Sequence, residues 1–121
     1  MRRAARRDAN EGRIVAALRA EGWVVEQVSS AGHPDLLLTR RGLVDVMEVK
    51  QYAHSPMTPA QVVVHARWER GGCRIPVVTD EVEAIEVLAG KRPPRTYRDF
   101  PWEGVTGEEK ARRLRGSPAT G

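Results

Sequence analysis

Residues 32–50 read GHPDLLLTRRGLVDVMEVK, and this stretch decides the fold. Pro34 favours an extended backbone, and the continuous apolar run that follows it predicts a strand over residues 35–39. A turn at residues 41–42 and a second strand over residues 43–50 complete a predicted β-hairpin.

The position of the turn sets which residues of the hairpin face one another. If residues 41–42 form the turn, Arg40 pairs with Leu43. Counting outward from that pair places Asp35 opposite Glu48 on the same face of the sheet, with β-carbons about 5 Å apart. Two carboxylates at this distance repel each other, and a bound divalent cation or a shared proton would relieve the repulsion.

An ammonium group is expected beside these two carboxylates. Because side chains alternate along a strand, Lys50 lies on the same face as Glu48. Val44 and Val46 precede Glu48 on its strand and indicate that its face points inward. Two structural alternatives stay open at this point: Glu48 and Lys50 form only a strand ion pair, or Asp35 only caps its loop.

The sequence before the hairpin predicts one helix and one strand. The helix has Asp8 as its N-cap, Glu11 three residues later and Gly22 just beyond its end. Its apolar stripe lies on the side of Glu11, whose carboxylate should therefore point toward the rest of the domain; the stripe consists of Ile14, Val15 and Leu18. The valine-rich residues 23–28, which are followed by a polar loop, predict a strand.

The sequence after the hairpin predicts a second helix and a fourth strand. Thr58, Pro59 and Gln61 supply an N-cap, a first-turn proline and a capping-box partner for a helix that ends near residue 70. Residues 74–79 predict a strand, and Pro76 favours a place at the sheet edge because proline cannot donate a ladder hydrogen bond.

A third helix is predicted to begin with Asp80 and Glu83 as its cap residues and to end at Gly90. Its apolar face comprises Val82, Ile85 and Leu88. The order of elements is then helix, three strands, helix, strand, helix. This order predicts an α/β fold over residues 8–90, with a central mixed four-stranded sheet flanked by helices.

A chain of 121 residues with 40% apolar content is long enough for one compact domain. Cys73 is the only cysteine, which excludes an internal disulfide and a cysteine-rich zinc site and favours a reducing compartment. The basic N-terminus is followed by no apolar signal region, and the sequence has no long apolar span. We therefore expect a cytoplasmic protein without a membrane segment.

Positive charge gathers at both ends of the chain, whose net charge is +4. A basic N-terminal arm, residues 1–7, holds four arginines and no acid, and a C-terminal tail, residues 91–121, holds eight basic and four acidic residues. Residues 8–90 are therefore acidic. An acidic centre between basic ends suits a protein that holds a cation and grips a polyanion, although charged ends can also serve solubility alone.

The C-terminal tail should be only partly ordered. Tyr97, Phe100 and Trp102 stand among charged residues, and we expect this segment to pack onto the domain only locally. Trp102 has three open roles: packing on the domain, bridging two subunits, or stacking on a nucleobase. Residues 106–115 predict a capped helix without an apolar stripe, and residues 116–121 should be disordered.

The Gly-x-Pro-Asp loop at residues 32–35 and the Glu-x-Lys strand at residues 48–50 resemble the motif of the PD-(D/E)XK nuclease superfamily. Within it, the sequence resembles small stand-alone VRR-NUC domains and, more distantly, archaeal Holliday junction resolvases. Those proteins also carry a glutamate on the first helix and a second helix that opens with proline and glutamine. The matching positions here are Glu11, Gly32, Pro34, Asp35, Glu48, Lys50, Pro59 and Gln61. The resemblance covers residues 8–90 and implies a restriction-endonuclease-like core.

This resemblance implies a metal-dependent endonuclease that hydrolyses DNA phosphodiester bonds. The implied ligands of Mg²⁺, which Mn²⁺ should be able to replace, are Asp35, Glu48, the Val49 carbonyl and, directly or through water, Glu11. Lys50 would orient the attacking water or stabilise the developing charge, and Gln61 would position Lys50 or the nucleophile. The implied catalytic set is Asp35, Glu48, Lys50, Glu11 and Gln61.

The implied substrate is branched or double-stranded DNA, such as a Holliday junction, cut by a homodimer; no small-molecule substrate is expected. The residues expected to contact DNA are Arg2, Arg3, Arg6, Arg7, His33, Arg112 and Arg113. Two alternatives are a sequence-specific, phage or host-defence nuclease and a non-catalytic DNA-binding module on the same fold. A capping-box role explains Glu11 and Gln61 equally well. The histidines, including His65, lack zinc-site spacing.

Overall fold

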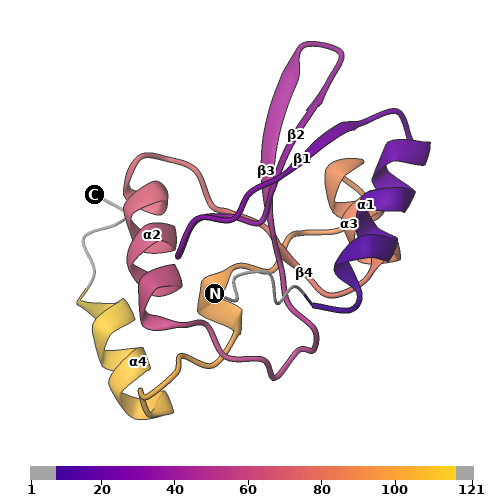
Figure 1. The fold of residues 1–121 in the computed structure, drawn as a ribbon. Helices are drawn as coiled ribbons and strands as arrows, with labels where there is room; N and C mark the ends of the chain where they lie inside the picture. The colour runs from indigo at the N-terminus through magenta and orange to yellow at the C-terminus, as the bar shows by residue number, and fades with distance from the viewer. Residues whose placement is uncertain (1–7, 117–121) are drawn as a thin grey trace.

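A mixed four-stranded sheet with helices on both faces forms the centre of the computed structural model, which describes residues 8–116 (Figure 1). The elements are, in chain order, α1 (Glu11–Ala20), β1 (Val24–Gln27), β2 (Leu36–Arg40), β3 (Leu43–Val49), α2 (Pro59–Arg70), β4 (Val77–Val78), α3 (Glu81–Leu88), the 3-10 helix η1 (Tyr97–Asp99) and α4 (Gly107–Arg115). Strands β1 to β3 are antiparallel, and β4 is parallel to β3. The predicted α/β class and element order through α3 are confirmed. None of the helices within residues 8–116 is long and apolar enough to cross a membrane.

The β2–β3 hairpin has the register that its turn predicts. Arg40 pairs with Leu43, and Leu36 pairs with Met47 at the other end of β2. The two turn residues between Arg40 and Leu43 have φ angles of 52° and 80°. Left-handed angles at both positions are what a tight two-residue hairpin turn requires. Asp35 lies one residue before β2, so this strand begins one residue later than predicted.

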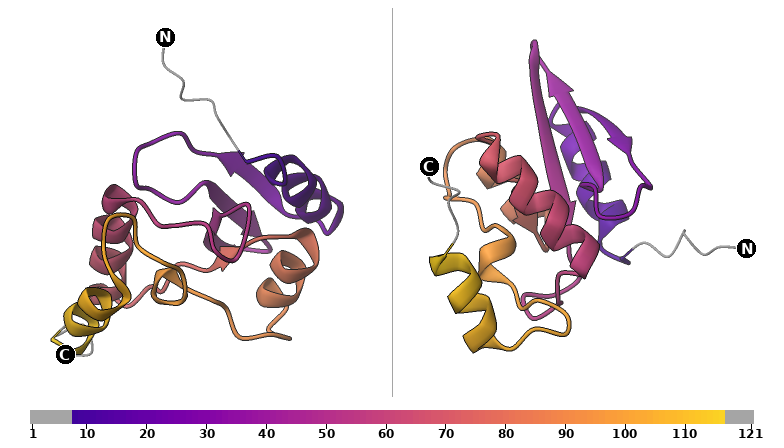
Figure 2. Two further views of the ribbon diagram at one scale, coloured as in Figure 1. Left: turned by 90° about the horizontal axis from the view of Figure 1, so that it is seen from below. Right: turned by 90° about the vertical axis from the view of Figure 1, so that its left-hand side faces the viewer.

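Helices α1 and α3 lie side by side on one face of the sheet, and α2 lies on the opposite face (Figures 1 and 2). The main apolar core fills the space between α1, α3 and the sheet; its buried members are Ile14, Val15, Leu18, Trp23, Val25, Leu36, Leu38, Met47, Val49, Val78 and Ala84.

Two predictions about which residues face the core are wrong. Val82 is 55% exposed, and Ala84 takes its place in the core. Val44 is 76% exposed because the hairpin tip extends beyond the helices (Figure 1).

A second apolar cluster joins the segment after residue 90 to α2 and β4. Its buried members are Met57, Val77, Tyr97, Phe100 and Trp102. Trp102 is 5% exposed, stacks on Tyr97 with ring centroids 5.6 Å apart, and donates its indole N–H to the Tyr97 carbonyl. The expectation of local packing only is therefore wrong for this part of the tail, and Trp102 packs on the domain. Thr106 caps α4 as predicted.

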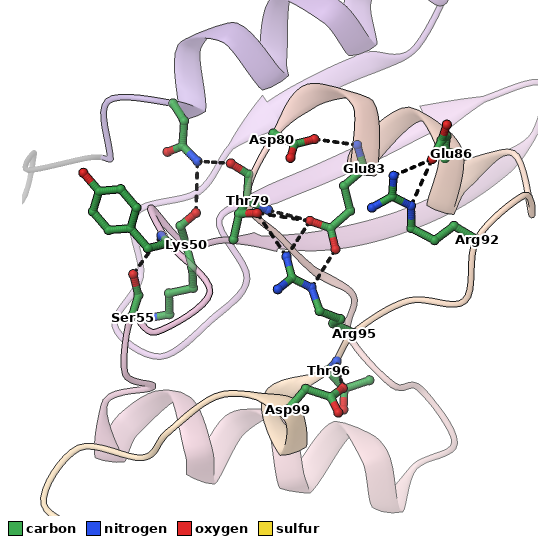
Figure 3. A network of polar contacts seen from close by, with 12 residues as sticks. Lys50, Ser55, Thr79, Asp80, Glu83, Glu86, Arg92, Arg95, Thr96 and Asp99 are labelled. Atoms are coloured by element: carbon green, nitrogen blue, oxygen red, sulfur yellow. Dashed lines mark hydrogen bonds and ion pairs between the residues drawn. The ribbon is translucent and has the colours of Figure 1, made fainter.

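Ion pairs at buried carboxylates fasten the same segment to the rest of the fold (Figure 3). Arg95 donates to both carboxylate oxygens of Glu83, at 2.8 and 2.6 Å, and to the Thr79 hydroxyl at 3.0 Å. Glu83 also accepts the Thr79 N–H, while Asp80 accepts the Glu83 N–H, so the predicted N-cap of α3 is present. On α2, the buried Glu69 accepts hydrogen bonds from the segment in a similar way.

The beginning of α1 and the extent of β4 differ from the predictions. Asn10 occupies the N-cap position in place of Asp8, and its side chain makes no cap bond. Glu11 is the first helical residue, so the capping-box explanation for it is wrong, because that role needs the third helical position. Strand β4 has two residues instead of the predicted 74–79, and it lies at an edge among the described strands, as Pro76 predicts.

Candidate functional site

A cleft of about 490 Å³ opens between the start of α1, the loop at residues 28–35, the end of β3 and the start of α2. It gathers every residue that the sequence suggested for metal binding or catalysis, together with His33: Glu11, His33, Asp35, Glu48, Val49, Lys50 and Gln61. Asp8 adds a further carboxylate. Arg112 and Arg113 lie on α4 and do not line the cleft, and the predicted DNA contacts Arg2, Arg3, Arg6 and Arg7 fall outside the described residues.

Gly32 allows the loop before β2 to lie directly against α2. Its φ angle is +78°, in the left-handed region that favours glycine. A β-carbon at this position would lie 2.6 Å from the backbone carbonyl oxygen of Ala60, in the first turn of α2. The Val28 N–H closes the base of the loop on the Asp35 carbonyl at 2.8 Å. The loop therefore brings the backbone of Asp35 to the cleft in a defined position.

Asp35 continues the β2–β3 pairing through its side chain. Its Oδ2 accepts a hydrogen bond from the backbone N–H of Val49 at 2.8 Å. The N–H groups of Glu48 and Lys50 bond instead to carbonyl groups of residues 76 and 78, on the β4 side. Because the N–H and C=O of one strand residue point the same way, the Val49 carbonyl oxygen lies on the Asp35 side of β3.

Glu48 is the most deeply buried carboxylate of the cleft. Its Oε2 accepts a hydrogen bond from Gln61 Nε2 at 3.1 Å, and its Oε1 contacts His65 Nε2 at 2.9 Å. The carboxyl group also hydrogen-bonds to Asp35. The two acidic side chains therefore meet across the hairpin, as its register predicts.

The environment of Glu48 favours its protonated form. Burial raises the pKa of Glu48 to about 7. The hydrogen bond to Asp35 and the charge of Lys50 act against this rise in pKa, whereas the charges of Glu11 and Asp8 add to it. Burial therefore favours a proton on Glu48 up to near-neutral pH. A retained proton is one of the two means expected to relieve the repulsion between the carboxylates.

Gln61 connects the Lys50 ammonium to the carboxylates. Lys50 Nζ donates to Gln61 Oε1 at 2.7 Å and to the Pro56 carbonyl at 2.9 Å. The same Oε1 accepts the Thr58 N–H, and Thr58 accepts the Gln61 N–H, so the predicted capping box is present. Gln61 thus has a capping role and a place in the site at once. No hydrogen bond or ion pair joins Lys50 to Glu48 within residues 8–116, which argues against a simple strand ion pair.

The start of α1 is tied to the end of β3. Glu11 is 3% exposed, and its Oε2 accepts a hydrogen bond from Gln27 at 2.9 Å. The neighbouring Asn10 donates its side-chain N–H groups to the carbonyls of Lys50 at 3.0 Å and Thr79 at 2.6 Å. Asn10 therefore sets the place of Glu11 relative to Lys50. No local sequence signal marked Asn10, because its partners lie 40 and 69 residues away.

His65 is a member of the site that the sequence interpretation missed. Its side chain has no exposed surface, and it contacts Glu48 from α2. Burial, and then the charge of Lys50, lower the pKa of His65 to about 4. The imidazole is therefore neutral at pH 7, and the contact is a hydrogen bond rather than an ion pair. Its spacing was the available signal, since His65 follows Gln61 by four residues and shares its helix face.

The donor atoms of the cleft are oxygens, which is the ligand type that hard divalent cations such as Mg²⁺ and Mn²⁺ prefer. Asp35, Glu48 and the Val49 carbonyl offer oxygen ligands. Within residues 8–116, no group of three or more His, Cys, Asp or Glu side chains is arranged to hold a metal ion. Mg²⁺ is usually bound through one or two carboxylates and water, and the cleft, which Glu11 also lines, offers donors of that kind.

Of the residues expected to contact DNA, His33, Arg112 and Arg113 lie within residues 8–116, and their surroundings differ. His33 is half-buried at the cleft, where its Nδ1 lies 3.3 Å from the Ser30 hydroxyl. Arg112 and Arg113 both pair with Glu109 on α4, so part of their positive charge is balanced within that helix.

Comparisons with protein-family models, with curated proteins and with solved structures find no match to this chain.

Proposed function

We propose that the protein is a divalent-metal-dependent endonuclease that hydrolyses DNA phosphodiester bonds and has a restriction-endonuclease-like core of the PD-(D/E)XK type. The observation that carries this proposal is the convergence of Asp35, Glu48 and Lys50 in one cleft, where Gln61 is bonded to both Glu48 and Lys50. The order of strands and helices and the Gly-x-Pro-Asp and Glu-x-Lys segments support the same assignment.

The proposed mechanism gives each residue one task. Asp35, Glu48 and the Val49 carbonyl would hold Mg²⁺, which supplies Lewis-acid stabilisation of a phosphate oxygen and a bound water of lowered pKa. Lys50 would place its positive charge beside the phosphate, where negative charge grows as water attacks phosphorus. Gln61 keeps the Lys50 ammonium oriented. Breaking the bond between phosphorus and the 3′ oxygen leaves 5′-phosphate and 3′-hydroxyl ends, as the family resemblance implies.

We further propose that the preferred substrate is branched DNA and that the protein acts as a homodimer. The support is the resemblance to VRR-NUC domains and to archaeal junction resolvases. A junction with two-fold symmetry needs two active sites for symmetric resolution, and a dimer supplies them. The mass of the protein in solution tests the dimer directly.

A cleavage assay with Mg²⁺ and matched linear, flap and four-way DNAs tests the activity. We expect the wild type to cut branched DNA, and Asp35→Ala, Glu48→Gln and Lys50→Met each to lose about 100-fold or more in rate. Asp45→Asn is the control, because Asp45 lies on β3 with Glu48 but does not line the cleft. No cleavage of any DNA by the wild type, with Asp35→Ala indistinguishable from it, would contradict the proposal.

Calorimetric titration with Mg²⁺ separates the nuclease from a non-catalytic DNA-binding module. A nuclease of this type should bind the ion, and Glu48→Gln should abolish binding. A module that only holds DNA would retain DNA binding but show no Mg²⁺ binding that depends on Glu48.

A further inference from the structure

We propose that His65 is a positioning residue of the cleft, which contacts one carboxylate oxygen of Glu48 and so fixes the orientation in which this carboxylate meets a divalent cation. This inference rests on the proposed function. His65 does not line the cleft, so it would act through Glu48 and would not touch the ion or the DNA.

Helix α2 holds the Glu48 carboxylate at two points. Gln61 Nε2 lies 3.1 Å from Oε2, and His65 Nε2 lies 2.9 Å from Oε1. The two α2 residues are four apart and therefore project from the same side of the helix. Because two side chains of one helix each contact a different oxygen, the orientation of the carboxylate plane is set by α2.

Packing alone does not account for a histidine at this position. The side chains of His65 and Glu48 are 0% and 1% exposed, and the imidazole Nδ1 is buried without a hydrogen-bond partner in the described part of the chain. A buried polar atom without a partner costs about 1 to 3 kcal/mol. A hydrocarbon side chain of similar size would fill the space without this cost. The hydrogen bond to Glu48 is the interaction that only the histidine provides.

The second apolar cluster supports the imidazole from another side. The Tyr97 ring lies 5.9 Å from the His65 ring, tilted by 59°, and the Tyr97 hydroxyl donates to Glu69 on the same helix at 2.8 Å. The segment after residue 90 thus reaches the cleft through Tyr97, His65 and Glu48 in turn. This contact limits the positions that the imidazole can take.

Two substitutions of nearly equal size separate the hydrogen bond from the packing. His65→Gln keeps an amide N–H at about the reach of Nε2, whereas His65→Met has the same length without a donor. Calorimetric titration with Mn²⁺ gives the affinity, and circular dichroism and thermal unfolding report whether each variant is folded. We expect His65→Met to weaken Mn²⁺ binding by about tenfold or more, as loss of a residue that orients a metal ligand does, and His65→Gln to stay within about threefold of the wild type.

The outcomes distinguish this role from the proposed function. Equal Mn²⁺ affinity of wild type and His65→Met, or equal weakening in both variants, would overturn the positioning role while the nuclease proposal stands. A wild type that binds no Mn²⁺ would overturn both. If His65→Met does not fold, ¹⁵N chemical shifts of the wild-type imidazole decide: a proton on Nε2 in the Mg²⁺-bound protein supports the role, and a proton on Nδ1 alone overturns it.

Discussion

The backbone N–H of Val49 donates to Asp35 Oδ2 at 2.8 Å, and this bond joins the loop before β2 to the last residue of β3. Asp35 therefore takes part in the structure of the hairpin as well as in the chemistry proposed for the cleft. The two roles can be separated, because one needs only an oxygen acceptor and the other needs a negative charge.

Asp35→Asn should remove the charge and keep an acceptor for the Val49 N–H. We expect its free energy of unfolding to stay within about 1 kcal/mol of the wild type, while Mn²⁺ affinity falls by about tenfold or more. Asp35→Ala removes the acceptor too and should lose about 1 to 2 kcal/mol more. Urea unfolding and calorimetric titration measure the two effects. Unchanged Mn²⁺ affinity in Asp35→Asn would rule out a ligand role for Asp35.

Metal binding should strengthen as the pH rises through 7. Only the ionised form of Glu48 is a good ligand, and burial raises its pKa to about 7. Binding of Mg²⁺ should therefore release more protons from Glu48 at pH 6 than at pH 7, and very few at pH 8.5. Calorimetry in two buffers with different ionisation enthalpies counts the released protons. A proton count that does not fall between pH 6.5 and pH 8.5 would contradict the raised pKa.

The metal-free protein should be stabilised by Glu48→Gln at alkaline pH. The pKa of Glu48 rises from 4.5 to about 7 on folding. The favourable contribution of its protonated form to the free energy of unfolding is therefore fully present below pH 4.5 and is lost as the pH rises through 7. That difference corresponds to about 3 kcal/mol. With a chelator present, Glu48→Gln should gain stability relative to the wild type between pH 5 and pH 8. His65 titrates in both proteins, which removes most of its effect from this comparison.

Urea unfolding of both proteins at the two pH values measures this gain. A relative stability of Glu48→Gln that is the same at pH 5 and pH 8 would show that Glu48 ionises without a burial cost.

The meeting of Asp35 and Glu48 in the cleft was predictable, because residues close together in the sequence determine the register of the hairpin. A two-residue turn sets the register from Arg40 and Leu43 outward, and the same count brings Asp35 to Glu48. The capping box at Gln61 is also a local pattern, and its geometry places the glutamine in the cleft. These signals involve neighbours in sequence, so they can be interpreted without the tertiary structure.

The rest of the site depends on contacts between distant parts of the chain. Asn10 binds Lys50 and Thr79 across 40 and 69 residues, which no local pattern encodes. The aromatic residues of the C-terminal segment follow no helical or strand period, so their joint burial with Met57 and Val77 was not visible in the sequence. Val82 has the spacing of a residue on the apolar face of a helix. In the structure, however, the side of α3 that carries Ala84 packs in the core, and Val82 is exposed.

Gly32→Ala should lower the free energy of unfolding more than Gly42→Ala, the same change at the hairpin turn. Both Gly32 and Gly42 have left-handed φ angles, of +78° and +80°, but only Gly32 has an atom within 4 Å of an added β-carbon. Gly42→Ala should therefore cost about 1 kcal/mol, the backbone term alone. Gly32→Ala adds the clash with Ala60 and should cost about 1 to 3 kcal/mol more. Urea unfolding of the two variants compares them, and equal losses would show that the loop does not depend on its close approach to α2.

The anchoring of the C-terminal segment can be tested with two arginines that pair with neighbouring glutamates of α3. Arg95 binds Glu83, which is 2% exposed, whereas Arg92 and Glu86 are each 40% exposed. Arg95→Met leaves the Glu83 charge buried without its main partner and should cost about 2 to 4 kcal/mol of unfolding free energy. Arg92→Met breaks a solvent-exposed pair and should cost less than about 1 kcal/mol.

The same pair of variants shows whether the segment supports the cleft. Because Tyr97 contacts His65, loosening the segment should also weaken Mn²⁺ binding in Arg95→Met but not in Arg92→Met. Equal stability losses in the two variants would mean that Glu83 finds water or another partner when Arg95 is removed. A large stability loss with unchanged Mn²⁺ affinity would mean that the cleft keeps its geometry without the C-terminal segment.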